Sequence, residues 1–114
     1  MPEPTRLLVI WSTTDREVAL HPAFMYARNG KRLGWWEEVR LIVWGPSARL
    51  LVEDAELQEG IKAMQNAGVQ VLACRACTDT YGVTEQLEQL GIEVVYIGQP
   101  LTKMLKEGWV TLTY

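Results

Sequence analysis

The chain has 114 residues, of which 48% are hydrophobic, and a formal net charge of −3. This length supports one domain with a hydrophobic core, and we predict a single domain over residues 1–114. Nucleic-acid binding is not expected, because the sequence contains no basic block that would neutralise phosphates. A membrane span is not expected either, because no apolar run approaches the ~20 residues that cross a bilayer.

The N-terminal sequence bears on the compartment. Met1-Pro2-Glu3-Pro4 lacks the basic region of a signal peptide, and the apolar stretch that follows has only the length of a strand. We therefore expect a cytoplasmic protein. In a reducing compartment, two closely spaced cysteines are more typical of catalytic, redox-active or metal-binding sites than of structural disulfides.

Strand and helix patterns alternate along the whole chain. In chain order we expect a strand at 6–11, a helix at 17–33, a strand at 39–44, a helical turn at 48–52, a helix at 54–67, a strand at 69–73, a helical segment to 90 that breaks near 82, a strand at 92–97, a short helix to 107 and a strand at 109–113. Buried strands that alternate with amphipathic helices predict a parallel sheet covered on both faces. The expected fold is a three-layer α/β/α domain with a five-stranded parallel sheet.

Two of the helices carry more specific expectations. Pro22 should kink the first helix or shift its start, because proline cannot donate an interior helix hydrogen bond. In the last helix, Leu101, Met104 and Leu105 should face inward.

The only two cysteines lie three residues apart, in Cys74-Arg75-Ala76-Cys77, where the third strand ends and a helix begins. Sites in open parallel sheets form beyond the carboxyl ends of the strands. A thiol at a helix start meets unpaired backbone N–H groups and the positive end of the helix dipole, which favour the thiolate. Arg75 adds a positive charge beside Cys74, which also favours a thiolate. We therefore assign Cys74, Cys77 and Arg75 to a candidate catalytic site.

Other interpretations of the cysteines stay open. Free cysteine is among the most buried residue types, so either thiol could be a small hydrophobe of the core. A tetrahedral zinc site needs four ligands, whereas the chain offers two thiols and a single histidine, His21. We therefore expect neither a metal nor a cofactor, unless two chains pool four thiols.

Five tryptophans are many for this length. Trp11 and Trp44 end predicted strands and are expected to wall the site. Trp35 and Trp36 lie in a connection between a helix and a strand. If this pair is exposed it indicates a subunit interface, and the alternative is burial in the local core.

The chain resembles the DsrE/DsrF-like (YchN-like) family over almost its whole length. The resemblance rests on the order of strands and helices and on three short motifs, Trp44-Gly45-Pro46-Ser47, Gly68-Val69 leading to Cys74, and Gly82-Val83 after it. It implies a five-stranded parallel sheet between helices, and trimers or hexamers. In sulfur-relay members, a cysteine at the end of the third strand accepts sulfur as a persulfide and passes it to a partner. Cys74 matches this cysteine, and Cys77 matches a second one found in part of the family.

These observations support three functional hypotheses. In the first, the chain is a sulfurtransferase-like sulfur carrier: Cys74 attacks a persulfide donor, Arg75 stabilises the anion, and the sulfur passes to an acceptor protein. Cys77 would then resolve the persulfide as a disulfide, or tune Cys74. In the second, Cys74 and Cys77 form a thioredoxin-like redox pair. In the third, the chain is a non-enzymatic oligomeric subunit with buried cysteines.

Overall fold

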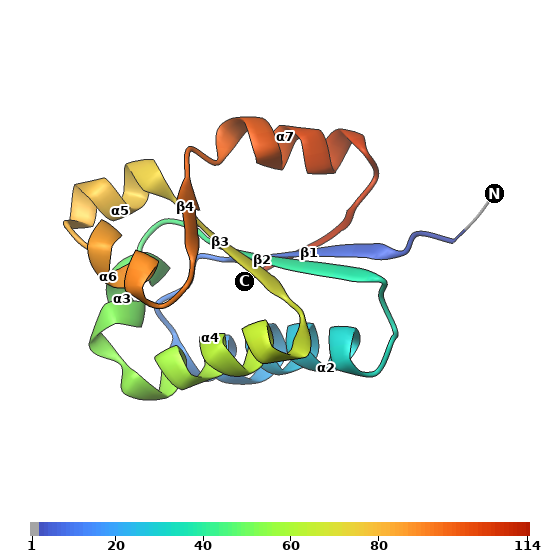
Figure 1. Cartoon of the computed structure of the whole chain (residues 1–114), viewed down its shortest axis with the longest axis horizontal. Coiled ribbons are helices and arrows are strands. Elements are labelled where there is room, and N and C mark those ends of the chain that lie inside the picture. The colour runs from blue at the N-terminus through green and yellow to red at the C-terminus, as the bar shows by residue number, and fades with distance from the viewer. Residues whose placement is uncertain (1–2) are drawn as a thin grey trace.

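A computed structural model describes residues 3–114, and its centre is a five-stranded sheet with helices on both faces (Figure 1). The strands are β1 (Arg6–Trp11), β2 (Glu38–Val43), β3 (Gln70–Cys74), β4 (Glu93–Val95) and β5 (Val110–Thr113). All neighbouring strands are parallel, in the order β4-β3-β2-β1-β5. The predicted α/β/α fold is confirmed. Met1 and Pro2, part of the segment that argued against a signal peptide, lie outside the described residues.

The helices fall into three groups around the sheet. They are α1 (Arg16–Val18), the π-helix η1 (Ala19–Met25), α2 (Tyr26–Arg32), α3 (Ser47–Glu53), α4 (Ala55–Ala67), α5 (Arg75–Tyr81), α6 (Thr84–Gln89) and α7 (Gly98–Lys106). In Figure 1, α2 and α4 lie on one side of the sheet and α7 on the other, while α3, α5 and α6 gather at one end of it. No helix within residues 3–114 has the length and apolar character that a membrane crossing requires.

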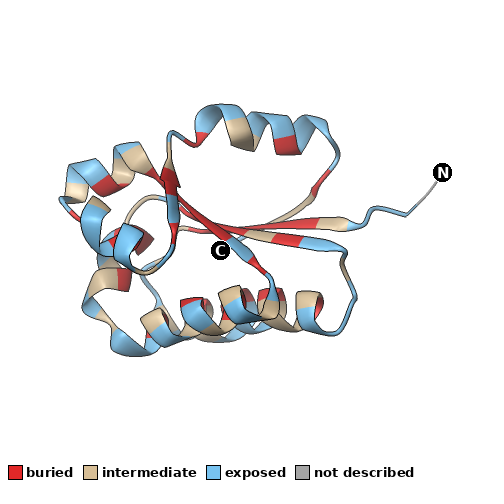
Figure 2. Ribbon diagram, viewed as in Figure 1, coloured by how far each residue is buried: buried red, intermediate tan, exposed pale blue. Residues whose placement is uncertain are grey.

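The two faces of the sheet support cores of different size. The larger core includes Leu7 and Val9 of β1 together with residues of η1, α2, α3 and α4. Helix α4 contributes Leu57, Ile61 and Met64, which recur at helical spacing and are fully buried. The smaller core consists of Leu8, Ile10, Ile42, Leu72, Cys74, Ile97, Met104 and Trp109. Helix α7 supplies a buried side chain to this second core, and its outer surface is exposed (Figure 2).

Pro22 lies inside a helical segment rather than at its start. The chain runs through α1, η1 and α2 without interruption, and Pro22 is part of the π-helical turn. Hydrogen bonds in a π-helix join residues five apart, so the wider turn accommodates a residue that cannot donate. The helical segment therefore begins at Arg16, before the proline, and its hydrogen-bond spacing changes where Pro22 lies.

The last helix presents a narrower apolar stripe than the sequence suggested. Met104 is 1% exposed and Leu101 is half-buried, but Leu105 is 50% exposed. Met104 and Leu105 are turned about 100° from each other around the helix, with Leu101 between them, so the orientation that buries Met104 turns Leu105 toward solvent. The prediction that Leu105 faces inward is therefore wrong.

Asp54 caps α4 and joins it to the first helix. Its carboxylate accepts the backbone N–H of Leu57 at 3.1 Å and the Nε of Arg16 at 2.8 Å. The hydrogen bond from Arg16 is the largest cause, and the bond from Leu57 the next, of a pKa for Asp54 below its ordinary value of 3.8.

We expect Asp54→Asn to remove part of the dependence of stability on acidic pH. Because the folded-state pKa is lowered, the carboxylate stabilises the fold above the ordinary value of 3.8 and loses this effect as pH falls through the folded-state value. Asparagine keeps an N-cap acceptor but does not titrate. Urea unfolding should show that the stability advantage of the wild type over the variant is larger at neutral pH than at acid pH. An advantage independent of pH would contradict this assignment.

Candidate functional site

The two cysteines meet where β3 ends and α5 begins. Cys74 is the last residue of β3 and the N-cap of α5, and Cys77 lies one turn into that helix. The two residues approach to 3.1 Å, and both are free thiols. Pairing of Cys74 with Val95 in β4 fixes the position of this strand end. The structure thus brings together the two thiols that the sequence placed in one site.

The two thiols differ in their access to solvent. Cys74 is only 5% exposed and belongs to the smaller core, together with Ile42, Leu72 and Ile97. Cys77 is half-buried and packs against the margin of the same core. An external reagent therefore reaches Cys77 more easily than Cys74.

A backbone N–H from the loop after β2 points at Cys77. The N–H of Gly45 donates to the Sγ of Cys77 at 3.3 Å. Gly45 has a φ of +71°, a left-handed conformation that side chains rarely adopt. No local sequence pattern indicates that Gly45 contacts a thiol, although the motif that begins at Trp44 marks this loop as a family feature. Gly45 is therefore an additional residue of the site.

Ser47 holds the loop that carries Gly45. This serine is fully buried, and its hydroxyl donates to the carbonyl oxygen of Trp11 at 2.6 Å. The Oγ of Ser47 also lies 3.1 Å from the carbonyl oxygen of Trp44. The hydroxyl thus ties the loop to the end of β1, and so fixes the position from which Gly45 reaches Cys77.

The pKa of Cys77 is raised, which is opposite to the shift expected from a helix N-terminus. Burial is the largest cause, the contact with Cys74 raises it further, and the N–H of Gly45 acts in the other direction. Two sulfurs in contact do not both carry a negative charge easily, so the neighbouring sulfur of Cys74 disfavours ionisation of Cys77.

We expect Cys74→Ala to lower the pKa of Cys77, because it removes the part of the upward shift that comes from Cys74. The alkylation rate of Cys77, measured by peptide mass spectrometry across a pH series, should reach its midpoint at lower pH in the variant than in the wild type. Cys74→Ser should move the midpoint in the same direction, since a hydroxyl can donate to the thiolate. An unchanged midpoint in both variants would show that burial alone sets this pKa.

Arg75 is engaged away from the thiols. Its guanidinium donates to the carbonyl oxygen of Val94 at 3.1 Å and pairs with the carboxylate of Glu88 at 3.7 Å. These contacts tie the first turn of α5 to β4 and α6. The hydrogen bonds and ion pairs described for residues 3–114 give Arg75 no contact with a sulfur atom, so its stabilisation of a thiolate stays a prediction.

The other residues singled out from the sequence lie in different surroundings. Trp11 is fully buried in the larger core, its ring edge-on to Phe24 at 4.8 Å, whereas Cys74 lies in the smaller core. The prediction that Trp11 walls the site is therefore wrong. His21 is exposed and pairs with Glu17 at 3.3 Å. Within residues 3–114, no group of three or more His, Cys, Asp or Glu side chains is placed to hold a metal ion.

The adjacent tryptophans divide between the two predicted alternatives. The Nε1 of Trp36 donates to the hydroxyl of Tyr26 at 3.2 Å, and the ring packs against the larger core. Trp35 is 58% exposed. One member of the pair is thus part of the core, and the other lies on the surface.

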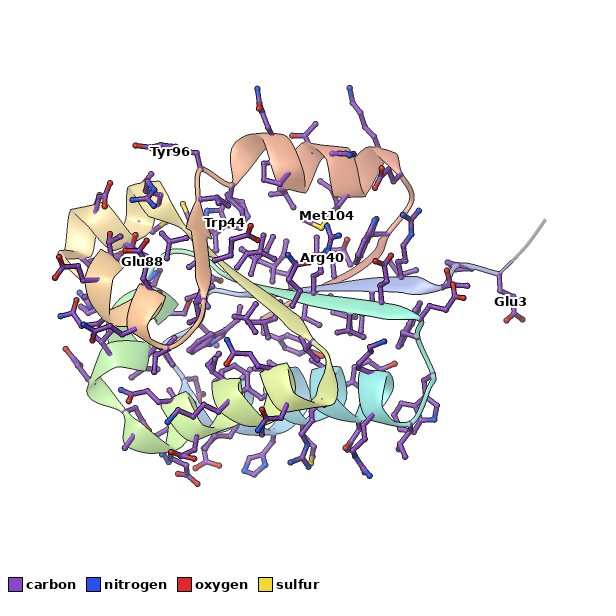
Figure 3. All side chains as sticks on the ribbon, viewed as in Figure 1. Glu3, Arg40, Trp44, Glu88, Tyr96 and Met104 are labelled. Atoms are coloured by element: carbon purple, nitrogen blue, oxygen red, sulfur yellow. The ribbon has the colours of Figure 1, made fainter. Side chains whose placement is uncertain are left out.

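Two exposed aromatic residues adjoin the cysteine site. Trp44 directly precedes Gly45 and is 38% exposed, and Tyr96 follows the strand residue that pairs with Cys74 and is 69% exposed. Figure 3 shows Tyr96 projecting outward near the start of α7. Aromatic surface is therefore available to a partner beside the thiols.

Comparisons with known proteins agree with this description. The model of the DsrE/DsrF-like family matches residues 10–114. A conserved protein of unknown function from Bacteroides thetaiotaomicron is 35% identical, with a TM-score of 0.93 over 96% of this chain and 95% of that one. A protein of unknown function from Methanobacterium thermoautotrophicum, 23% identical, shares the fold with a TM-score of 0.73 over 96% of this chain and 98% of that one. A search of curated proteins found no match. The chain belongs to the DsrE/DsrF-like family.

Proposed function

We propose that the chain is a sulfur carrier, in which the Cys74 and Cys77 pair takes sulfur from a persulfide donor and passes it to an acceptor thiol. The observation that carries the proposal is the 3.1 Å approach of these two cysteine residues at the start of α5, with the N–H of Gly45 donating to the Sγ of Cys77. Cys74 occupies the position of the relay cysteine in the family that the chain resembles. The two similar solved proteins are of unknown function, so the proposal rests on this geometry and on that resemblance.

The chemistry needs a thiolate and a means of holding an anionic sulfur. A thiolate of the pair attacks the outer sulfur of the donor persulfide, the sulfur–sulfur bond of the donor breaks, and the donor leaves as a thiol. The product is a cysteine persulfide on this chain. Backbone N–H groups at the start of α5 and the N–H of Gly45 are placed to stabilise negative charge on the sulfur.

A double variant tests the proposal without a choice between the cysteines. Reduced wild-type protein is incubated with glutathione persulfide and examined by intact-mass and peptide mass spectrometry, with Cys74→Ser/Cys77→Ser as the matched control. We expect sulfur uptake or release that depends on the cysteine pair, and none in the double variant. Identical traces for the two proteins would reject the sulfur-carrier proposal.

The proposed function requires partners, and exposed aromatic side chains suggest where they bind. Trp44 and Tyr96 adjoin the thiols and suit a donor or acceptor protein. Leu33 and Trp35 form an exposed apolar pair elsewhere, 50% and 58% exposed, and suit contact between copies in a cytoplasmic trimer or hexamer. Light scattering coupled to gel filtration should give a mass of three or six chains. A smaller mass for Trp35→Ser would support this interface, and a monomeric wild type would reject it.

A dithiol redox protein is the second candidate, and the same proximity of Cys74 and Cys77 at a helix start favours it. In this case the pair would cycle between dithiol and disulfide without carrying sulfur. Equilibration in glutathione redox buffers gives its reduction potential. A potential near the cytosolic glutathione poise, together with no sulfur uptake from the persulfide donor, would favour this function over the carrier.

A further inference from the structure

We infer that the two thiols have different tasks, with Cys77 receiving the sulfur and Cys74 then releasing it as sulfide. This inference rests on the proposed function and deepens it. The family motif directs attention to Cys74 as the cysteine that accepts sulfur, whereas the burial and contacts of the two side chains point to Cys77.

Access separates the two thiols. The receiving thiol has to approach the outer sulfur of a persulfide that another molecule holds. Cys74 is 5% exposed and is enclosed in the smaller core, whereas Cys77 is half-buried at its margin. The loop residue that contacts Cys77 follows Trp44, which is 38% exposed, so Cys77 lies on the side from which a donor can arrive.

The contact with Gly45 also distinguishes Cys77. The Gly45 N–H is directed at the Sγ of Cys77 at 3.3 Å, and the buried Ser47 hydroxyl holds the loop that supplies it. This donor is present before sulfur arrives, so it requires no rearrangement when the charge of a thiolate or persulfide develops. A thiol of raised pKa is also intrinsically more nucleophilic once ionised, so uptake at Cys77 should quicken as pH rises.

Cys74 is placed for the second step. A persulfide on Cys77 carries its inner sulfur within reach of Cys74, given the 3.1 Å approach of the two residues. The Cys74 thiolate attacks the inner sulfur, a bond forms between the two cysteines, and the bond to the outer sulfur breaks. The outer sulfur leaves with the bonding electrons as hydrosulfide and takes up a proton.

The balance of this step needs no oxidant other than the persulfide. The outer sulfur is reduced to sulfide, while the two cysteines are oxidised to one disulfide. An external dithiol, either a protein or a small molecule, then returns the pair to the reduced state. An acceptor that attacks the outer sulfur before Cys74 reacts receives it intact. The persulfide on Cys77 is therefore transferred when an acceptor is present and discharged as sulfide when it is absent.

The experiment compares the wild type with Cys74→Ser and Cys77→Ser, using glutathione persulfide as donor and the double variant as the baseline for sulfide. Adducts are located by peptide mass spectrometry and sulfide is measured with a fluorescent probe. In Cys74→Ser we expect a lasting one-sulfur adduct on Cys77. In the wild type we expect the disulfide and one equivalent of sulfide above the baseline. In Cys77→Ser we expect uptake at least an order of magnitude slower than in Cys74→Ser.

Other results would overturn the inference in separable ways. A lasting adduct on Cys74 in Cys77→Ser, with none in Cys74→Ser, would reverse the roles and leave the carrier function intact. A lasting wild-type adduct on Cys77 without sulfide would reject the discharge step alone. No adduct and no sulfide above baseline in any form would reject the carrier function itself. Should Cys74→Ser fail to fold, Cys74→Ala takes its place, and a wild-type reaction quenched early by alkylation locates the first adduct independently.

Discussion

The free energy of unfolding should fall by about 2–5 kcal/mol in the Met104→Ala variant, the range found when a buried methionine is cut to alanine. Met104 is 1% exposed and is the fully buried side chain that α7 contributes to the smaller core. The loss should lie at the upper end of that range if the core does not collapse around the cavity. Urea unfolding followed by circular dichroism measures the change.

Leu105→Ala provides the matched control on the same helix. Leu105 is 50% exposed, so its truncation should change the free energy of unfolding by no more than about 0.5 kcal/mol. Leucine and alanine both favour helix, so the comparison isolates the burial of the side chain. Equal losses in the two variants would show that α7 does not depend on Met104 for its attachment to the sheet.

Ser47→Ala is expected to destabilise the fold by about 0.5–1.5 kcal/mol, the net contribution of one hydrogen bond, because the carbonyl oxygen of Trp11 keeps the N–H of Trp44 as a second donor at 2.9 Å. The carbonyl oxygen of Trp11 accepts the Ser47 hydroxyl at 2.6 Å, and alanine cannot replace this donor. The same change should slow sulfur uptake at Cys77, since the loop that positions the N–H of Gly45 loses one of its two hydrogen bonds to the carbonyl oxygen of Trp11.

The control for this prediction is Ser12→Ala. The Ser12 hydroxyl also donates to a carbonyl oxygen, that of Tyr114 at 3.1 Å, but in a half-buried position outside the loop that contacts Cys77. Its loss should have a smaller effect on the free energy of unfolding and none on the rate of sulfur uptake. If Ser47→Ala lowers stability yet leaves that rate unchanged, Gly45 has no part in the chemistry.

The sequence was sufficient for the fold because its strands are continuous apolar runs separated by helices. After Arg6, the run in β1 is apolar at every position, which is typical of a parallel sheet covered on both faces. The same property hides which face each residue takes. Trp11 therefore could not be assigned to the larger core from the sequence, since the five residues of β1 that follow Arg6 are all apolar.

Part of the site followed from local sequence and part required distant contacts. Cys74 and Cys77 were found because a strand end and a helix start are both local signals. The contact between Gly45 and Cys77 joins residues 32 positions apart. The motif around Trp44 identified the loop but not the thiol that the loop contacts. Arg75 is next to Cys74 in the chain, yet its side chain binds a carbonyl oxygen of β4 and a carboxylate of α6. Chain proximity thus located the thiols but not the groups around them.

The lengths of the strands bear on how copies of this chain can associate. The outermost strands, β4 with three residues and β5 with four, are the shortest in the sheet. Short edges offer few free backbone groups for pairing, a common protection against edge-to-edge aggregation. A continuous sheet that runs from one copy into the next is therefore disfavoured. If copies associate through side-chain surfaces instead, each sheet keeps its five strands, and the thiols at its end stay accessible to a donor.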